Sequence, residues 1–587
     1  MDLLNLIESG ILLWDGDLST VLPENELGQD RPIEKLCLEA PELVRMTHVK
    51  FAEAGAMGIT TNTSRANRVS LSKFTLEDAT REINLKGAKI ARDVAKRGVF
   101  VAGSVGPTGK YLRPLGDMDF TEAVCVFEEQ IEALVLGGVE TILIEKMVDV
   151  REMKAAIIAS KRVSNLPVIA MMTFQENMKT LFGTGPAPFG VIAGGVGADL
   201  LGLEYGGSRK GMAELISLLT SVTEKPVIVR MGARNLTIGQ GQPAHIEGTR
   251  EYSQKAKDCI FPGVRIIGGG TGTNPEHVRE TRTILGYRTQ VGIETISAPP
   301  RIRLLQGVIR VASRSRVECI DLDGPLKVVG ERINPTGKPK FIKELKKGTM
   351  DHVVKEAKTQ EKMGAHLLDV NASAPGLDEG FAMEESVFSV NTSSSLPIMI
   401  DSSNTDVIRR GLCAVDGLPI INSVSGLRRK LETILPLARE FGSPLICLPF
   451  DEKGIPETPE GRLKVARRIL LEAEKAGVTR DKLIVDSLAT AVSHSRFASL
   501  CALETVKLIK RELGLPVIMG VSNVSYGMPM RGLINRAFLA MSIAQGLDLA
   551  MIDPCDESMS EFLLCGNLLT GKDINGKKFI RHFNGDN

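Results

Sequence analysis

The sequence predicts an α/β protein made of two (β/α)8 TIM barrels in tandem, joined by a packed linker. Three observations lead to this prediction. The chain of 587 residues is longer than one hydrophobic core usually supports, so at least two domains are expected. Apolar runs of strand length occur eight times before residue 288 and eight times after residue 325. Segments of helix length separate them, and eight alternating units are typical of this barrel.

The first half of the chain, residues 1–288, is assigned to the first barrel. Its eight apolar runs lie at 11–17, 58–63, 99–106, 141–147, 167–174, 199–207, 226–232 and 264–270. Glycines follow several of these runs, as at 104–109 and 268–272. Glycine permits tight turns, its commoner use, and also lets the backbone approach a ligand closely.

The alternation stops in residues 289–325, which we assign to the linker. Paired prolines, Pro299 and Pro300, and clustered arginines are typical of a domain boundary. The segment is partly apolar, so we expect it to pack against the barrels. Residues 326–587 form the second predicted barrel, with runs at 328–334, 366–371, 397–402, 419–425, 445–450, 483–488, 516–523 and 549–554. From Gly571 the chain is polar and basic, and a frayed end is expected.

Composition excludes several classes of function. The net charge is +1 and the pI is near 7.5, so we expect no nucleic-acid partner and no membrane-surface partner. The first residues lack the basic start of a signal peptide, and no run of about 18 apolar residues occurs, which predicts a cytoplasmic protein. The nine cysteines include no CxxC and no adjacent pair, so neither a disulfide framework nor a cysteine-rich metal site is expected.

In TIM barrels the carboxyl ends of the strands form the active-site rim. The polar residues at these positions of the second barrel are Glu331, Asn334, Asp369, Asn371, Asp401, Asn422, Asp486, Asn523 and Asp553. Lys, Arg and His are almost missing from this rim. Carboxylates and amides suit a neutral heterocycle better than a phosphate. The alternative is that these residues only cap helices or close turns.

Several motifs occur in one order along the second barrel: GERIN (330–334), DVN (369–371), IDSSN (400–404), INS (421–423), VD (485–486), SNVS (522–525), INRAFLA (534–540) and DPCDE (553–557). This part of the chain resembles the pterin-binding family. That family includes methyltetrahydrofolate:corrinoid methyltransferases, the folate module of cobalamin-dependent methionine synthase and, more distantly, dihydropteroate synthase.

The resemblance implies roles for the rim residues. Asp401, Asn422 and Asp486 are expected to hydrogen-bond the pterin ring, and Asn523 to lie near N5, which carries the methyl group. A tertiary amine is a poor leaving group, and a neutral amide can donate to N5 without a tuned pKa, so Asn523 is the expected catalytic residue. Further substrate-binding residues are expected among Glu331, Asn334, Asp369, Asn371 and Ser525. Ser487 and Leu488 follow Asp486 where the family commonly has Asp-Pro, so the path of that loop is left open.

The first barrel resembles the homocysteine S-methyltransferase domain, through DGDLST (15–20), TNT (61–63), VGPTG (105–109), MTF (172–174) and GTNPEHV (272–278). That family binds zinc through three cysteines, whose positions are occupied here by Tyr205, Gly270 and Thr271. These residues are not soft ligands, so no zinc and no other metal is expected. Lys146 stands where the family has threonine in Glu-Thr-Phe.

The expected function is methyl transfer between N5 of methyltetrahydrofolate and the cobalt of a corrinoid, or cobalamin, on a separate protein, because no segment resembles a cobalamin module. Tetrahydrofolate is the demethylated form. The alternatives are a methionine synthase fragment that methylates homocysteine without zinc, and a folate-binding scaffold without turnover. Dihydropteroate synthase is disfavoured, since its pyrophosphate site needs a basic residue. A homodimer, and the role of the first barrel, are left open.

Overall fold

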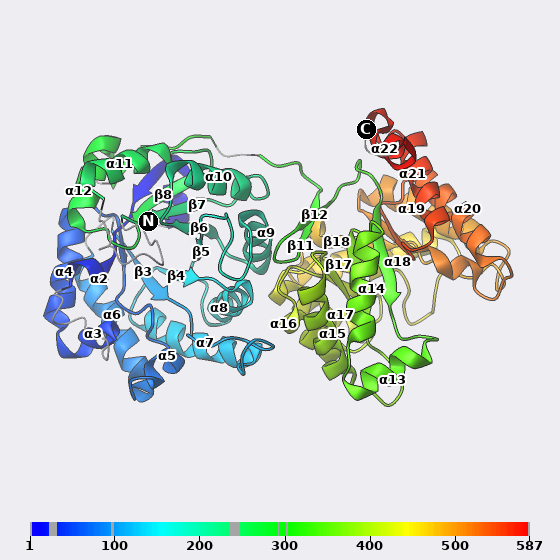
Figure 1. Cartoon of the computed structure of the whole chain (residues 1–587), viewed down its shortest axis with the longest axis horizontal. Coiled ribbons are helices and arrows are strands. Elements are labelled where there is room, and N and C mark those ends of the chain that lie inside the picture. Colours follow the sequence, from blue (N-terminus) through cyan, green and yellow to red (C-terminus); the bar gives the residue numbers. More distant parts are fainter. Residues whose placement is uncertain are drawn as a thin grey trace. The chain divides into compact units, whose positions relative to one another are not determined.

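The computed structural model describes residues 3–22, 32–95, 99–233, 247–290, 293–300 and 303–584. These residues divide into two compact units, Met1–Leu304 and Leu305–Asn587. In each unit parallel strands alternate with helices that surround them (Figure 1). Every one of the sixteen predicted apolar runs contains a strand, and the prediction of an α/β chain with two TIM-like barrels is confirmed.

The first unit contains eight parallel strands in the spatial order β2-β3-β4-β5-β6-β7-β8-β1, followed by the antiparallel strands β10 and β9. Their bounds are β1 (Gly10–Leu13), β2 (Gly58–Thr60), β3 (Phe100–Val105), β4 (Thr141–Met147), β5 (Val168–Phe174), β6 (Leu200–Tyr205), β7 (Val227–Met231), β8 (Val264–Gly269), β9 (Arg288–Gln290) and β10 (Ile293–Ser297).

The ring of the first unit closes between β1 and β2 through few contacts. Trp14 forms a parallel bridge with Gly58. The backbone amide of Met57 donates to the carbonyl of Leu13 (2.8 Å), and the backbone amide of Asp15 donates to the carbonyl of Gly58 (3.0 Å). A Cβ atom on Gly58 would lie 2.1 Å from the Trp14 ring. The closure therefore requires glycine at this position.

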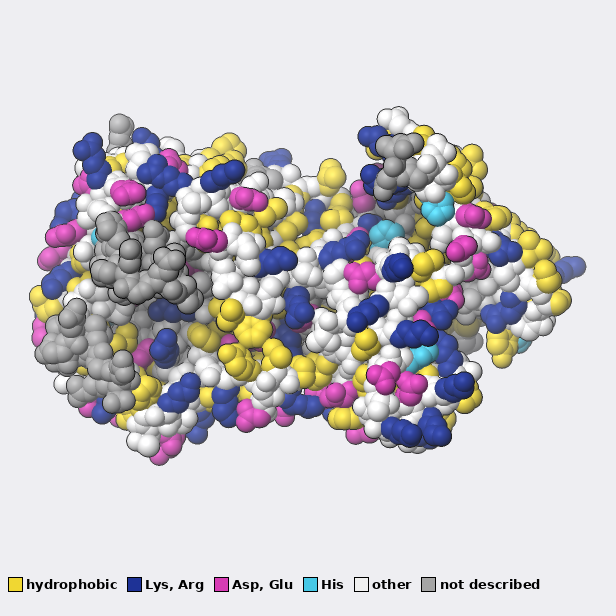
Figure 2. Space-filling model, in the orientation of Figure 1, with side chains coloured by type: hydrophobic (Ala, Val, Ile, Leu, Met, Phe, Trp, Pro, Cys, Tyr) yellow, Lys and Arg dark blue, Asp and Glu magenta, His cyan; other side chains and the backbone are white. Residues whose placement is uncertain are grey.

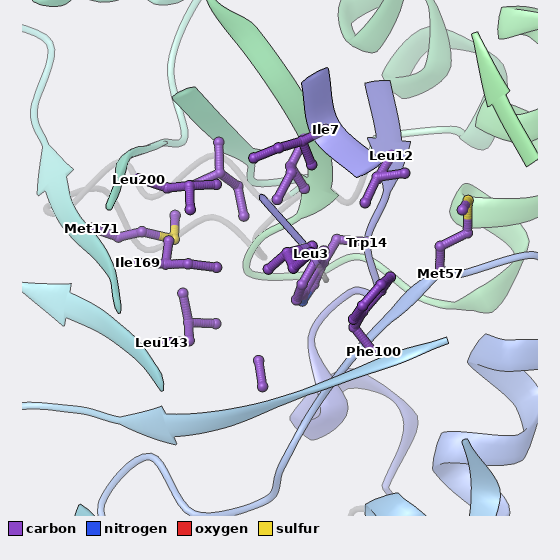
Figure 3. Close-up of a cluster of buried hydrophobic side chains, with 13 residues drawn as sticks. Leu3, Ile7, Leu12, Trp14, Met57, Phe100, Leu143, Ile169, Met171 and Leu200 are labelled. Carbon is purple, nitrogen blue, oxygen red and sulfur yellow. The ribbon is translucent and has the colours of Figure 1, made fainter. Parts of the chain in front are cut away.

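One end of the first barrel is filled by apolar side chains. Leu3 and Ile7 of α1 (Leu3–Ser9) belong to the same buried cluster as Trp14 and residues of seven strands, including Leu143 and Leu200 (Figure 3). The other helices of this unit are α2 (Leu18–Val21), α3 (Leu36–Glu39), α4 (Pro41–Glu53), α5 (Arg68–Ser72), α6 (Thr80–Val94), α7 (Phe120–Leu136), α8 (Val150–Val163), α9 (Pro186–Val196), α10 (Arg209–Thr220), α11 (Thr249–Asp258) and α12 (Pro275–Leu285).

The second unit is a closed parallel barrel in which strand order follows the sequence and β13 pairs with β20. Its strands are β13 (Lys327–Ile333), β14 (Leu367–Asn371), β15 (Ile398–Asp401), β16 (Ile420–Ser425), β17 (Leu445–Leu448), β18 (Leu483–Asp486), β19 (Val517–Gly520) and β20 (Leu549–Ile552). The core cluster takes an apolar residue from each strand, among them Val329, Leu367 and Ile518. Carboxylates and amides follow at the other ends of these strands.

A hairpin of β11 (Ile309–Ala312) and β12 (Val317–Ile320) adds Ile309, Val311 and Ile320 to the core of the second barrel. It belongs to the residues that we assigned to the linker, as does β10, which pairs with β1. The linker assignment itself stays a prediction. The helices of the second unit are α13 (Pro339–Lys347), α14 (Asp351–Lys362), α15 (Glu379–Ser393), α16 (Thr405–Ala414), α17 (Arg428–Phe441), α18 (Pro459–Lys475), α19 (Ala498–Leu513), α20 (Arg531–Ala544), α21 (Glu557–Leu569) and α22 (Lys577–Asn584).

The prediction of a frayed end from Gly571 was wrong, because α22 continues the chain to Asn584. The Asp573 carboxylate accepts the amides of Lys578 (3.1 Å) and Phe579 (2.9 Å), which satisfies donors at the start of this helix. On the surface, basic and acidic side chains are interspersed over the face shown in Figure 2.

Candidate functional sites at the two barrel mouths

A row of polar side chains crosses three neighbouring strands of the second barrel. Asn371 of β14 pairs in register with Asp401 of β15, which pairs in turn with Asn422 of β16. The Asn371 amide donates to Asp401 Oδ2 (2.9 Å), and the Asn422 amide donates to Asp369 Oδ1 (3.4 Å). Four of the predicted site residues therefore lie in one cluster at the barrel mouth.

The two carboxyl groups of this cluster are held in an environment that favours protonation. Burial raises the pKa of Asp369 well above its ordinary range, and the charge of Asp401 raises it further. Burial also raises the pKa of Asp401, against the hydrogen bond from Asn371. Like charges this close oppose each other's ionisation, so the pair retains a proton to higher pH than an exposed pair would.

Asp486 lies at the end of β18, where burial raises its pKa to about 6. Its Oδ1 accepts the amide of Leu488 (2.7 Å), and Leu488 adopts a left-handed conformation with φ 56°. Arg462 donates to the carbonyls of Ser487 (2.6 Å) and Leu488 (2.9 Å). These contacts hold the loop in which Ser487 and Leu488 depart from the family's pattern.

Asn523 lies on a short 3-10 turn, Val521–Ser525, directly after β19, and is exposed. Its side-chain amide makes no hydrogen bond with any residue that the structure describes. The turn is held by its neighbours: Ser522 Oγ donates to Glu331 Oε2 (3.2 Å), and buried Ser525 accepts from Arg531 Nε (3.1 Å). The amide of Asn523 is thus available to a ligand while its backbone is fixed.

The remaining predicted residues divide into two groups. Glu331 faces the turn of Asn523, and burial raises its pKa to about 7, with the Ser522 hydrogen bond opposing. Asn334 accepts the amide of Thr336 (2.9 Å), and Asp553 accepts Arg332 Nη1 (2.7 Å) and the amide of Cys555 (2.9 Å). Asn334 and Asp553 therefore close turns or pair with a cation instead of joining the cluster.

The prediction that this rim has almost no basic residues was wrong. Arg332 forms ion pairs with Glu356 and Asp553, and Lys338 donates to the carbonyl of Arg332 (2.6 Å). Alternation along β13 accounts for the error, since Glu331 contacts Ser522 while the next residue, Arg332, reaches Glu356 on α14. The arginine was visible within GERIN, but its partners lie far away in the sequence.

The mouth of the first barrel contains a cavity of about 630 Å³. Its floor is a closed network in which buried Arg230 donates to Glu145 Oε2 (2.6 Å), Asp15 Oδ1 (2.9 Å) and Thr60 Oγ1 (2.7 Å). Ser104 Oγ donates to Glu145 Oε1 (2.6 Å), and the amide of Thr60 to Asp15 Oδ2 (2.6 Å). Burial raises the pKa of Asp15 to about 6, although Arg230 lowers it. None of these contacts was predicted from the sequence.

Comparison with known families matches a different family model to each half of the chain. The family model described as homocysteine S-methyltransferase matches residues 12–285, and the model described as pterin binding enzyme matches residues 330–553. Each model covers less than half of the chain, so the first barrel is similar to the one family and the second barrel to the other.

The chain is also similar to methionine synthases. It is 28% identical over 583 residues to that of Mycobacterium tuberculosis (strain ATCC 25618 / H37Rv) and 27% identical over 589 residues to that of Mycobacterium leprae (strain TN). Each match covers 94% of this chain and 48% of the relative, so the chain spans about half the length of these curated relatives. The metallated homocysteine methyltransferase MmuM of Escherichia coli matches 48% of this chain and 98% of its own, with 20% identity and a TM-score of 0.41.

In the first barrel, the three positions that the resemblance assigns to zinc-binding cysteines hold Tyr205, Gly270 and Thr271, and the absence of zinc stays a prediction. Tyr205 is buried, and its phenol packs so closely that a Cβ on Gly207 would lie 2.3 Å from its hydroxyl. Gly270 has no side chain, and Thr271 supplies only a hydroxyl. Within the described ranges no cluster of His, Cys, Asp and Glu is suited to a metal ion, and no helix has the length and hydropathy needed to cross a membrane.

Proposed function

We propose that this protein transfers a methyl group between N5 of methyltetrahydrofolate and the cobalt of a corrinoid carried on a separate protein. The observation that supports this proposal best is the mouth of the pterin-binding domain. An acid and amide cluster on three adjacent strands stands at the same rim as an amide, Asn523, that has no partner among the described residues. The similarity to methionine synthases supports methyl transfer from a folate.

The cluster offers both kinds of hydrogen-bonding group to a pterin ring. Asp401, Asn422 and Asp486 would hold the ring, with Asp369 and Asn371 behind them. An ionised carboxylate accepts from ring N–H groups, whereas a carboxyl that keeps its proton also donates to a ring acceptor. A proton retained by the pair of Asp369 and Asp401 would therefore let one site satisfy both edges of the heterocycle.

Asn523 would assist the departure of the methyl group. The N5 nitrogen gains electron density as its bond to the methyl group breaks, and an amide that donates a hydrogen bond to N5 stabilises that change. Because the Asn523 amide makes no hydrogen bond to the described residues, no internal contact has to break first. Its exposed position leaves the methyl group accessible to a bulky acceptor in line with the breaking bond.

The experiment that tests the proposal mixes the full chain with methyltetrahydrofolate and a corrinoid protein in the Co(I) state under anoxic conditions. We expect the cobalt absorbance to change to that of methylcobalt, and Asn523→Ala to slow this change. Tyr526→Phe, three residues away on an exposed side chain, is the matched control and should leave the rate unaltered. Folded protein that binds folate without any transfer to several corrinoid proteins would indicate a scaffold instead.

A second candidate is methylation of homocysteine without zinc, which the family match over residues 12–285 favours. Homocysteine-dependent loss of the methyl group from methylcobalamin, in buffer that contains a chelator, would support it. If the loss depends on added zinc, or does not occur at all, this candidate fails.

A further inference from the structure

The second barrel carries a basic helix at the edge of its mouth. Residues 338–347 contain five lysines and one acid, and most of them form α13, which follows the end of β13. Figure 2 shows several basic side chains over the place that α13 occupies in Figure 1. The acid, Glu344, accepts the amide of His352 (3.1 Å). No ion pair among the described residues involves the exposed lysines of this helix, which are Lys340, Lys343, Lys346 and Lys347. The helix therefore presents uncompensated positive charge to solvent.

Two contacts hold α13 beside the mouth. At its start, Lys338 Nζ donates to the carbonyl of Arg332 in β13 (2.6 Å). Near its end, Lys346 Nζ lies 3.4 Å from the position that a Cβ on Gly376 would take, in the loop that follows β14. Both contacts are made at the carboxyl ends of strands, where the rim of a barrel lies. The basic helix therefore borders the part of the rim that bears Asn371.

The stability of the helix does not account for its lysine pattern. Cations stabilise the last turn of a helix, where Lys346 and Lys347 lie, through the helix dipole. Lys340 lies in the first turn, where that dipole disfavours a cation and where the helix has no acid. Lys340, Lys343 and Lys347 form a basic row: they recur at the spacing of one helix face and span about 10 Å along the axis. Such a row is complementary to a chain of successive carboxylates.

We propose that this basic row binds the tail of a polyglutamylated methyltetrahydrofolate. Each further γ-linked glutamate of such a tail adds one carboxylate, so the tail is a flexible chain of anions. Charges in series attract such a chain even where each exposed ion pair is weak. The inference rests on the proposed function, because it assigns a longer tail to the folate of that function.

The path of the tail leads toward α13. The tail is attached at C6, which is bonded to N5, so with N5 near Asn523 the tail leaves the ring beside that turn. Ser522 of the turn contacts Glu331 of β13 (3.2 Å), and the chain runs from β13 directly into α13. The cations closer to the turn already have partners: Arg332 pairs with two acids, and Arg531 donates to the serines of the turn. The lysines of the basic row are left to receive the carboxylates.

The test is calorimetric titration of the full chain with the monoglutamate and the pentaglutamate of methyltetrahydrofolate. At low salt the pentaglutamate should bind about tenfold more tightly, because several exposed ion pairs of ordinary strength add up to that factor. The advantage should fall to about twofold or less near 1 M salt, where the screening length shortens to about 3 Å. Equal affinities at low salt would overturn this inference and leave the proposed function intact. If neither folate bound, both would be overturned.

A double variant, Lys343→Gln with Lys347→Gln, assigns the tail to α13. It should reduce the advantage of the pentaglutamate at low salt from about tenfold to about threefold or less. Its affinity for the monoglutamate should stay that of the wild type, which also shows that the barrel is folded. The matched control, Lys464→Gln with Lys507→Gln, removes the same charge from exposed positions of α18 and α19, which follow β17 and β18 across the barrel from β13. This control should keep the full advantage.

Three results with the α13 variant would refute the assignment. The first is an undiminished advantage of the pentaglutamate. The second is an equal loss of affinity for both folates, which would indicate damage to the pterin site. The third is slower methyl transfer from the monoglutamate with unaltered folate affinity, which would mean that the basic row contacts the corrinoid protein instead of the folate tail.

Discussion

The two barrels have the same fold, but the carboxylates at their mouths have different partners. In the first, Asp15 and Glu145 surround Arg230, and every oxygen of the two acids has a partner. In the second, Asp369 lies beside Asp401. The side-chain amide of Asn371 donates to Asp401, and that of Asn422 donates to Asp369. No cation pairs with either of these two acids among the described residues.

This difference distinguishes acids that stabilise the fold from acids that are available to bind a ligand. A buried cation among carboxylates is satisfied within the protein, and it closes the floor of a cavity. A pair of acids without a cation keeps raised pKa values and unused hydrogen-bonding capacity, which is more common where a ligand completes the site. The comparison therefore predicts that substitutions in the first network change folding, whereas those in the cluster around Asp369 and Asp401 change ligand chemistry.

The largest effect is expected for Arg230→Met. Removal of the guanidinium leaves Asp15 and Glu145 buried without a counter-ion, which should lower the free energy of unfolding by about 3–5 kcal/mol. Trp14 is the only tryptophan in the chain and is buried in the first barrel, so its fluorescence during urea unfolding reports on this unit alone. Arg209→Met, which breaks the exposed pair with Asp258, should cost less than about 1 kcal/mol. Equal effects would contradict a structural role for the network.

Asn523→Ala should slow methyl transfer by about a hundredfold, the typical effect of removing one donor that stabilises developing charge. Folate binding should change little, because the amide acts chiefly as the methyl leaves. Asn422→Ala should do the reverse and weaken methyltetrahydrofolate binding by about tenfold. Stopped-flow absorbance and equilibrium titration measure the two quantities. If Asn523→Ala altered affinity alone, Asn523 would be a binding residue and not a catalytic one.

The sequence predicted the strands well, because each apolar run is bounded by polar or glycine residues whose signal is local. It also predicted that Asn371, Asp401 and Asn422 would meet, since parallel strand ends share one rim. The hairpin of β11 and β12 was missed. Its apolar residues are interrupted by Arg310 and Glu318, and they pack against the core of a barrel that begins later in the chain.

The network of the first barrel could not be found in the same way. Arg230 lies within an apolar run, and its partners Glu145 and Asp15 are 85 and 215 residues away. No local pattern marks which strand end will supply a counter-ion. Lys146 was visible only as a departure from the family's Glu-Thr-Phe, and the distortion that directs it into the cavity comes from the shifted register between β4 and β5.

The third prediction concerns pH. The pKa of Glu331 is raised by burial from 4.5 to about 7, so its contribution to stability is fully present below pH 4.5 and is lost as the pH rises through 7. Glu331→Gln should therefore leave the second barrel more stable than the wild type by about 2 kcal/mol at pH 8, and equally stable at pH 4.

Hydrogen exchange of peptides from β13 to β20 measures the effect of Glu331→Gln, since the second unit contains no tryptophan. Glu474→Gln, an exposed acid on α18, is the control and should show no dependence of this kind. A gain in stability at pH 4 would mean that the glutamine improves packing, and the interpretation of Glu331 as an uncompensated buried acid would fail.

The smallest effects are expected at two matched helix caps. Asn274 accepts the amides of Glu276 and His277 at the start of α12, and Asn404 accepts that of Asp406 at the start of α16. Either asparagine replaced by alanine should cost about 1 kcal/mol, read by Trp14 fluorescence for the first barrel and by hydrogen exchange for the second. Similar costs would show that the scaffolds are equivalent and that the barrels differ only at their mouths. Asn404 belongs to the IDSSN motif, so its substitution carries a second test: unaltered folate affinity identifies a cap, whereas reduced affinity with little loss of stability would extend the pterin site to this helix.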